Sequence, residues 1–208
     1  MNASPAPLAV PHTAPTDHRP VWIALALWAT AAIVFALSGA LAHLPPPAVA
    51  PLIWAPVIAF VVAYRRSEAL RGFVRDLDLR APVLFHVVRV YYGAAFLTEL
   101  AAGRIPELFA RVAGPGDIAA GLLALPAALL VTRRDRASRA LTLAWNAFAL
   151  ADILAVMVTA QYTLFALRDR RLFDAFLRAP FAFLPVLVVP LVLVTHGVVF
   201  LRLRHAAR

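Results

Sequence analysis

Six long apolar stretches, separated by short polar segments, constrain the fold of this chain more than any other feature. They are residues 21–42, 48–64, 82–100, 117–132, 140–162 and 180–203. A helix needs about 20 apolar residues to cross the ~30 Å hydrocarbon core of a bilayer. The stretches lack the alternation of barrel strands, so helices are the remaining way to satisfy the backbone inside a membrane. The sequence therefore predicts an all-α polytopic bundle of about six transmembrane helices over residues 21–204.

The composition agrees with a bilayer as the solvent. Hydrophobic residues make up 62% of the chain and charged residues 15%, and the mean hydropathy is +0.80. A soluble domain is nearer 45–50% apolar and about 25% charged. These values exclude a disordered chain, a coiled coil and a disulfide scaffold. Cysteine is absent, which also excludes thiolate metal sites and a cysteine nucleophile.

The arginines predict the orientation. All 20 basic residues are Arg, and the formal charge is +9. With six spans, the Arg-rich segments 65–80 and 133–139 fall on the same side as both termini, which the positive-inside rule places in the cytoplasm. Short Arg clusters between apolar runs favour an anionic leaflet over nucleic acid, so we expect a bilayer and no nucleic acid as partner. Arg in place of Lys, with abundant Ala and Pro, indicates a GC-rich genome and thus a bacterial cytoplasmic (inner) membrane.

Three segments outside the spans need an interpretation. Residues 1–20 are rich in Pro, Ala and Thr and are expected to form a disordered tail. Residues 164–179 mix apolar residues with four Arg and predict an amphipathic helix on the outer surface, although a five-span topology would explain the same charges. Residues 40–42 resemble a signal-peptide cleavage site, but the long preceding tail and long apolar run favour an uncleaved first helix.

Five polar residues inside the spans predict a ligand-binding site. Ionisable side chains in hydrocarbon are costly and are functional candidates by default. At a rise of ~1.5 Å per residue, four of the five lie at one depth in the cytoplasmic third, and the fifth, Asp152, lies deeper. The set is His86, Arg89, Asn146, Asp152 and His196.

Several alternatives share these residues. An ion pair of Arg89 with Asp152 or Glu99 would fix the register of the helices. His86 and His196, at similar depth on separate helices, could supply the two axial ligands of a b-type haem. A quinone against the same donors is a second cofactor candidate. A proton relay through Asp152 and His196 is a further option. A metal set of both histidines with Asp152 would require Asp152 to reach another layer, so we expect no metal site.

The residues that precede Asp117 in the sequence indicate a structural role for it. It follows Gly114, Pro115 and Gly116, a sequence typical of a turn. We therefore expect it to open the fourth helix as an N-cap or first-turn acid, at the outer face of the membrane.

Residues 89–125 carry a resemblance to a known family. The elements are Arg89-x3-Gly93-x2-Phe96-Leu97, the short piece 105–110, and Asp117-x3-Gly121-Leu122. They resemble the middle of DoxX-like bacterial membrane proteins. The resemblance implies a small inner-membrane helical bundle, in a family of which some members are linked to quinone or respiratory redox chemistry.

The function predicted from these observations is a small-molecule binding or transport bundle for a hydrophobic or anionic ligand, with its polar layer as the site. One alternative is a membrane redox protein that binds haem or quinone. Another is an accessory or scaffold subunit whose polar residues only specify packing. Nucleotide loops, zinc-protease motifs and serine-hydrolase elbows are absent from the sequence, and whether the protein is an enzyme stays open.

Overall fold

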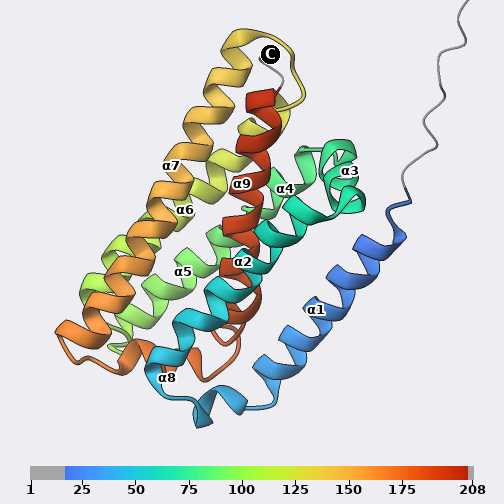
Figure 1. Ribbon diagram of the computed structural model, residues 1–208. Coiled ribbons are helices and arrows are strands. Elements are labelled where there is room, and N and C mark those ends of the chain that lie inside the picture. The colour runs from blue at the N-terminus through green and yellow to red at the C-terminus, as the bar shows by residue number, and fades with distance from the viewer. Residues whose placement is uncertain (1–16, 206–208) are drawn as a thin grey trace, which may run out of the picture.

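The computed structural model describes residues 17–205, and every regular element in that range is helical (Figure 1). Six helical segments of the described range are long and apolar enough to cross a membrane. They are Arg19–Leu37, Pro46–Arg66, Arg80–Ala101, Glu107–Leu130, Arg136–Ala166 and Leu184–Arg204. The predicted all-α class is confirmed for the described range, and six of its helical segments have the length and apolar character that the predicted spans require.

Short breaks divide some spans into more than one element. In chain order the helices are α1 (Arg19–Leu37), α2 (Val49–Arg66), α3 (Glu68–Asp76), α4 (Arg80–Phe85), α5 (Val88–Ala101), α6 (Glu107–Leu130), α7 (Arg136–Gln161), α8 (Arg171–Phe176) and α9 (Val189–His205). Tighter 3₁₀ turns form η1 (Ala40–His43) and η2 (Pro46–Ala48), and wider π-helical turns form η3 (Tyr162–Ala166) and η4 (Leu184–Val188). The third span is broken at His86 and Val87, between α4 and α5.

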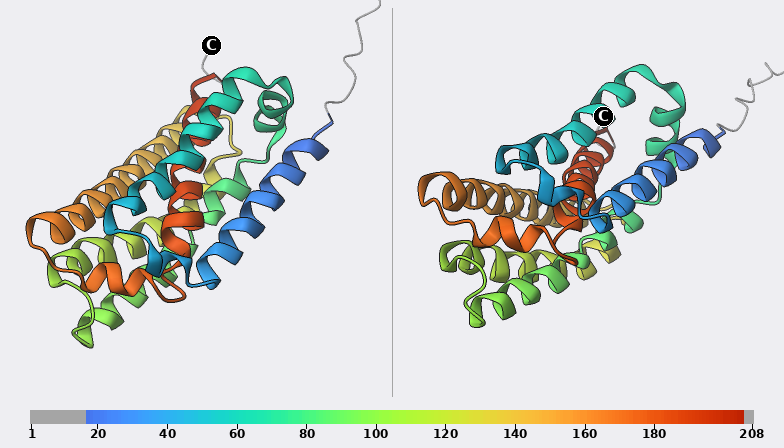
Figure 2. Two further views of the ribbon diagram at one scale, coloured as in Figure 1. Left: turned by 60° about the horizontal axis from the view of Figure 1, so that its bottom comes forward. Right: turned by 90° about the horizontal axis from the view of Figure 1, so that it is seen from below.

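The helices run up and down along one bundle direction. Figure 1 shows α5, α6 and α7 side by side, with α9 against them, while α1 stands at the edge of the bundle. The right view of Figure 2, seen from below, shows α1 at the edge as well. The start of α1, the end of α9, α3 and the segment between α6 and α7 lie at one end of the bundle, which we call the arginine-rich end (Figure 1).

The predicted start of the fourth span is wrong. We expected residues 117–132, preceded by a loop, whereas α6 begins at Glu107 and runs unbroken to Leu130. Pro115 and its flanking glycines lie inside this helix, because a helix packed among neighbours in a bundle tolerates a proline that would end it in water. The second span is likewise longer than predicted, at 21 residues, and is not a short segment.

The single amphipathic helix predicted over residues 164–179 is not present in the structure, which has a π-helical turn and one short helix in this segment. Residues 162–166 extend α7 as a π-helical turn, and only α8 is a separate helix. α8 buries Leu172 and Phe173 in the main apolar cluster, so the segment closes the bundle rather than lying along its surface. Of the tail predicted over residues 1–20, residues 1–16 lie outside the described residues, and α1 already begins at Arg19.

Glycines let α5 and α6 approach each other closely. A Cβ atom on Gly93 would lie 2.6 Å from the carbonyl oxygen of Gly114. A Cβ atom on Gly121 would lie 2.9 Å from the backbone nitrogen of Val90 and 3.0 Å from the carbonyl oxygen of His86. These are backbone atoms that cannot move away, so small residues are required at this crossing, an arrangement that is common in the helix pairs of membrane proteins.

Gly121→Ala is expected to destabilise the protein by about 1–3 kcal/mol, because the added methyl group overpacks the crossing. Gly197→Ala is the matched control, since a Cβ atom there meets nothing within 4 Å. Alanine in a helix interior is favoured over glycine by roughly 0.5–1 kcal/mol, so the control should be neutral or stabilising. Thermal unfolding in detergent measures both, and equal stability of the two variants would contradict the close crossing.

The start of α7 depends on a charged cap. The Asp135 carboxylate accepts a hydrogen bond of 2.8 Å from the backbone N–H of Ser138. This hydrogen bond holds the pKa of Asp135 below its ordinary value. Since the folded pKa lies below the unfolded one, the contribution to stability is complete above the unfolded value and is lost as the pH falls through the folded one.

Asp135→Asn is expected to remove this pH dependence while keeping the cap, because asparagine caps helices about as well as aspartate. Tm measured in detergent at neutral pH and at about pH 3 should show wild type losing more stability than the variant on acidification. Parallel losses in both proteins would show that the charge of Asp135 contributes nothing to the cap.

Candidate functional site

Polar side chains from four helices and from the break between α4 and α5 meet in the middle of the bundle. We call this group the polar core, and it consists of His86, Arg89, Asp117, Asn146, Asp152, Thr195 and His196. Above and below it lie two apolar clusters. One contains Tyr92, Ile153 and Val192, and the other contains Val83 and Val199. The polar core is therefore enclosed by apolar side chains along the bundle axis, where unpaired polar groups are costly.

Arg89 is the centre of the charged half of the polar core, with only 2% of its surface exposed. Its Nε donates to Asp117 Oδ1 at 2.6 Å, and its Nη1 donates to the carbonyl oxygen of Ala149 at 2.9 Å. Its Nη2 forms a short ion pair with Asp152. The predicted pairing with Asp152 is confirmed, whereas the alternative partner, Glu99, pairs with a surface arginine instead.

The expectation for Asp117 is wrong. This residue does not open a helix, because α6 begins ten positions earlier, at Glu107. Its carboxylate is buried, with 6% of the side chain exposed, and it binds Arg89. Reading Pro106 and Glu107 as the helix start would have placed Asp117 in the middle of a span, where an acid needs a partner.

Gly116 makes room for the second carboxylate. A Cβ atom on Gly116 would overlap Asp152 Oδ1. The glycine pair around Pro115, which we interpreted as a turn, therefore serves packing: Gly114 accepts the side chain of Leu97 from α5, and Gly116 accepts Asp152 from α7.

Two histidines form the other half of the polar core. His86 Nε2 lies 3.0 Å from Thr195 Oγ1, and His196 Nδ1 lies 2.8 Å from Asn146 Oδ1. The two imidazole ring centres are 4.2 Å apart, and Trp145 packs edge-on against His86 at 5.2 Å. The remaining ring nitrogens, His86 Nδ1 and His196 Nε2, are buried and have no hydrogen-bond partner among the described residues.

The charges of the polar core do not balance when every carboxylate is ionised. One guanidinium faces two carboxylates, so the group carries one excess negative charge. An uncompensated charge in an apolar interior is costly. A single proton, held on a carboxylate or on one of the adjacent imidazoles, would restore neutrality. The arrangement can thus bind and exchange one proton.

The histidine pair does not fit a haem. An iron bound between two axial imidazoles would separate the ring centres by roughly 6 Å, given metal–nitrogen bonds of about 2.0–2.1 Å. The observed 4.2 Å places the rings in direct contact, with no space for a porphyrin between them. Within residues 17–205, no group of three or more His, Cys, Asp or Glu side chains is arranged to hold a metal ion.

All five residues predicted for the site come together in the structure. They form two neighbouring groups: Arg89 pairs with Asp152, while a ring contact and a hydrogen bond join His86, His196 and Asn146. The backbone N–H of Arg89 donates to the carbonyl oxygen of His86, which places the two groups next to each other along the chain. Their role in ligand binding stays a prediction. Asp117 and Thr195 were not predicted for the site. Asp117 carries a signal, as an acid ten residues inside a helix, whereas Thr195 carries none by residue type alone.

Arg89→Met is expected to cost about 3–5 kcal/mol, because it leaves two buried carboxylates without their cation. Adding Asp117→Asn and Asp152→Asn to that variant should recover part of the loss by removing the uncompensated charges. Arg104→Met is the control, since the Arg104–Glu99 pair lies at the surface, where such pairs contribute about 0–1 kcal/mol. Chemical or thermal unfolding in detergent decides, and a loss no larger than the control's would contradict the central role of Arg89.

Comparison with known proteins gives one match. A family model described as "Domain of unknown function (DUF8737)" matches residues 46–204, which begin at the second span and end in α9. No curated protein and no solved structure matches the chain. The resemblance to DoxX-like membrane proteins stays a prediction, because these comparisons bear on it in neither direction.

Proposed function

We propose that this chain, which belongs to the DUF8737 family, is a small-molecule binding or transport bundle of the membrane that takes up a proton in its polar core. The observation that carries the proposal is the sharing of one buried arginine by two carboxylates, directly beside two histidines with free ring nitrogens. Buried charges of this kind in apolar helices mark ion and proton pathways.

The outer surface supports insertion into a bilayer. Large apolar side chains point outward from several helices, with Leu27, Leu129 and Val158 exposed by 67%, 72% and 68%. Such a surface would aggregate in water and is suited to lipid. We place the arginine-rich end in the cytoplasm by the positive-inside rule, and the all-Arg, Ala- and Pro-rich composition supports a bacterial inner membrane.

A pocket at the side of the bundle supports a hydrophobic ligand. It has a volume of about 440 Å³ and lies between α1, α2, α3 and α9. Its lining is apolar apart from Ser67 and includes Trp28, Phe60 and Val194. The volume is within the range of small-molecule sites, roughly 300–1,000 Å³. Val194 directly precedes Thr195 of the polar core, so a ligand in this pocket would lie against the same helix that carries His196.

Infrared difference spectra recorded between about pH 5 and pH 8 test the proton directly, since both carboxyl and imidazole groups change their bands on protonation. Wild type is expected to show the titration of one buried group. Asp152→Asn should abolish it, because one guanidinium then faces one carboxylate. Glu107→Gln, which removes a surface acid paired with Arg111, should leave it unchanged.

Uptake into proteoliposomes tests whether the protein transports a ligand. A panel of radiolabelled hydrophobic carboxylic acids serves as the probe. Protein-free liposomes measure the passive entry of the neutral acids, and the uptake above this level that a pH gradient drives should be lost in Asp152→Asn and retained in Glu107→Gln. Wild type without a buried titration in the spectra would overturn the proton role. The polar core would then act in packing alone, as in a scaffold subunit.

A further inference from the structure

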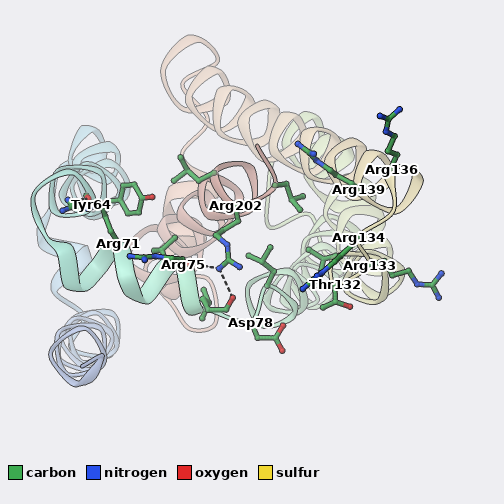
Figure 3. Close-up of a pocket in the computed structure, with 16 residues that line it drawn as sticks. Tyr64, Arg71, Arg75, Asp78, Thr132, Arg133, Arg134, Arg136, Arg139 and Arg202 are labelled. Carbon is green, nitrogen blue, oxygen red and sulfur yellow. Dashed lines mark hydrogen bonds between the residues drawn. The ribbon is translucent and has the colours of Figure 1, made fainter. Parts of the chain in front are cut away.

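A large basic pocket opens at the arginine-rich end, well away from the polar core. Its volume is about 1260 Å³, and it lies between α3, the segment from residue 131 to 139, and the last turns of α9 (Figure 3). Seven arginines and a single carboxylate line it. The arginines are Arg71, Arg75, Arg133, Arg134, Arg136, Arg139 and Arg202.

Arg202 fixes the pocket in shape. Its Nη1 donates to the carbonyl oxygens of Val74 at 2.6 Å and Leu77 at 3.2 Å, which ties α9 to the end of α3. Figure 3 shows Arg202 between the two walls, with Arg134 and Arg139 turned toward the middle from the opposite wall. The pocket is therefore held by hydrogen bonds between helices and is more than a gap between flexible loops.

The positive charge of this pocket is largely uncompensated. Its one carboxylate, Asp78, pairs with Arg80, which does not line the pocket. Of the lining arginines, only Arg71 has an acidic partner among the described residues, a surface contact of 3.7 Å with Glu68. Arginines of like charge gathered without acids repel one another, and an anionic ligand would relieve that repulsion.

We propose that this pocket binds phosphate groups, carried by an anionic phospholipid headgroup or by a soluble phosphorylated molecule. The planar guanidinium fork matches a phosphate in bidentate geometry, which makes arginine the preferred residue for such ligands. The volume is far larger than one phosphate requires. Val131, Leu201 and Leu203 line the same pocket, which suits a ligand that carries an apolar part beside its phosphates.

This inference is independent of the polar core. The pocket shares no residue with the buried ion pairs or with the histidine pair. From the sequence, these arginines predict only a general attraction to an anionic leaflet, which requires net charge and no defined site. A shaped pocket adds a requirement that net charge does not: particular arginines should matter, and others at the same end should not.

The test uses the purified full-length chain in a neutral detergent, with thermal unfolding as the readout. One arm adds phosphatidylglycerol to the micelles, with phosphatidylcholine as the zwitterionic comparison, because its choline cation offsets the charge of its phosphate. The other arm adds inorganic pyrophosphate, with sulfate as the comparison. Stabilisation by phosphatidylglycerol alone assigns a lipid headgroup, and stabilisation by pyrophosphate alone assigns a soluble ligand. Stabilisation by both supports phosphate recognition from either source.

Two double variants separate the pocket from the surface charge. Arg134→Ala with Arg139→Ala removes the two arginines turned inward and should weaken the apparent affinity at least about tenfold. Arg66→Ala with Arg204→Ala removes the same charge from the same end without touching the pocket lining and should change the affinity by less than roughly twofold. If the first double variant does not fold, Arg75→Ala, an exposed residue on α3, replaces it.

Two results would overturn the proposal. One is that neither phosphatidylglycerol nor pyrophosphate stabilises wild type more than its comparison compound. The other is that both double variants weaken the response equally, which would show that only the overall charge of this end matters.

Discussion

The ion pairs of Arg89 connect three helices of the bundle, and the arrangement of the others depends on them. A guanidinium on α5 reaches a carboxylate on α6, a carboxylate on α7 and a backbone carbonyl on α7. Inside an apolar bundle these groups have no other partners, so a shift of any one helix would leave a charge unpaired. The glycines of α5 and α6 bring the helices close enough for the arginine to reach both acids.

The two halves of the polar core differ in what they can do. The arginine half is satisfied by its partners and fixes the register. The histidine half keeps two ring nitrogens free, on rings in contact with each other. In the function proposed above, the excess negative charge of the two carboxylates favours the uptake of one proton by the polar core, and the free ring nitrogens are open to a ligand group.

Much of this arrangement follows from the sequence, and the reasons for the failures are physical. The length and hydropathy of the apolar stretches were sufficient to predict six helices. The cost of polar groups in hydrocarbon was sufficient to single out the residues that lie in the polar core, namely His86, Arg89, Asn146, Asp152 and His196. The rule that Gly-Pro-Gly marks a turn failed at residues 114–116, because it describes chains in water. Inside a bundle the helix continues, and this error misplaced Asp117. The basic pocket could not be predicted from the sequence, because it forms only where α3, the segment 131–139 and the end of α9 meet.

The peripheral helix α1 decides whether the number of membrane crossings available to the chain is odd or even. The family match covers residues 46–204, which include the whole polar core and the whole lining of the basic pocket. Five of the six helical segments long and apolar enough to cross a membrane lie in this range. An odd number of crossings brings a chain out on the face opposite its entry. α1 adds a sixth helix long and apolar enough to cross, and its start lies at the same end of the bundle as the end of α9 (Figure 1). In the membrane orientation proposed above, this peripheral helix gives both ends of the described chain access to the same compartment.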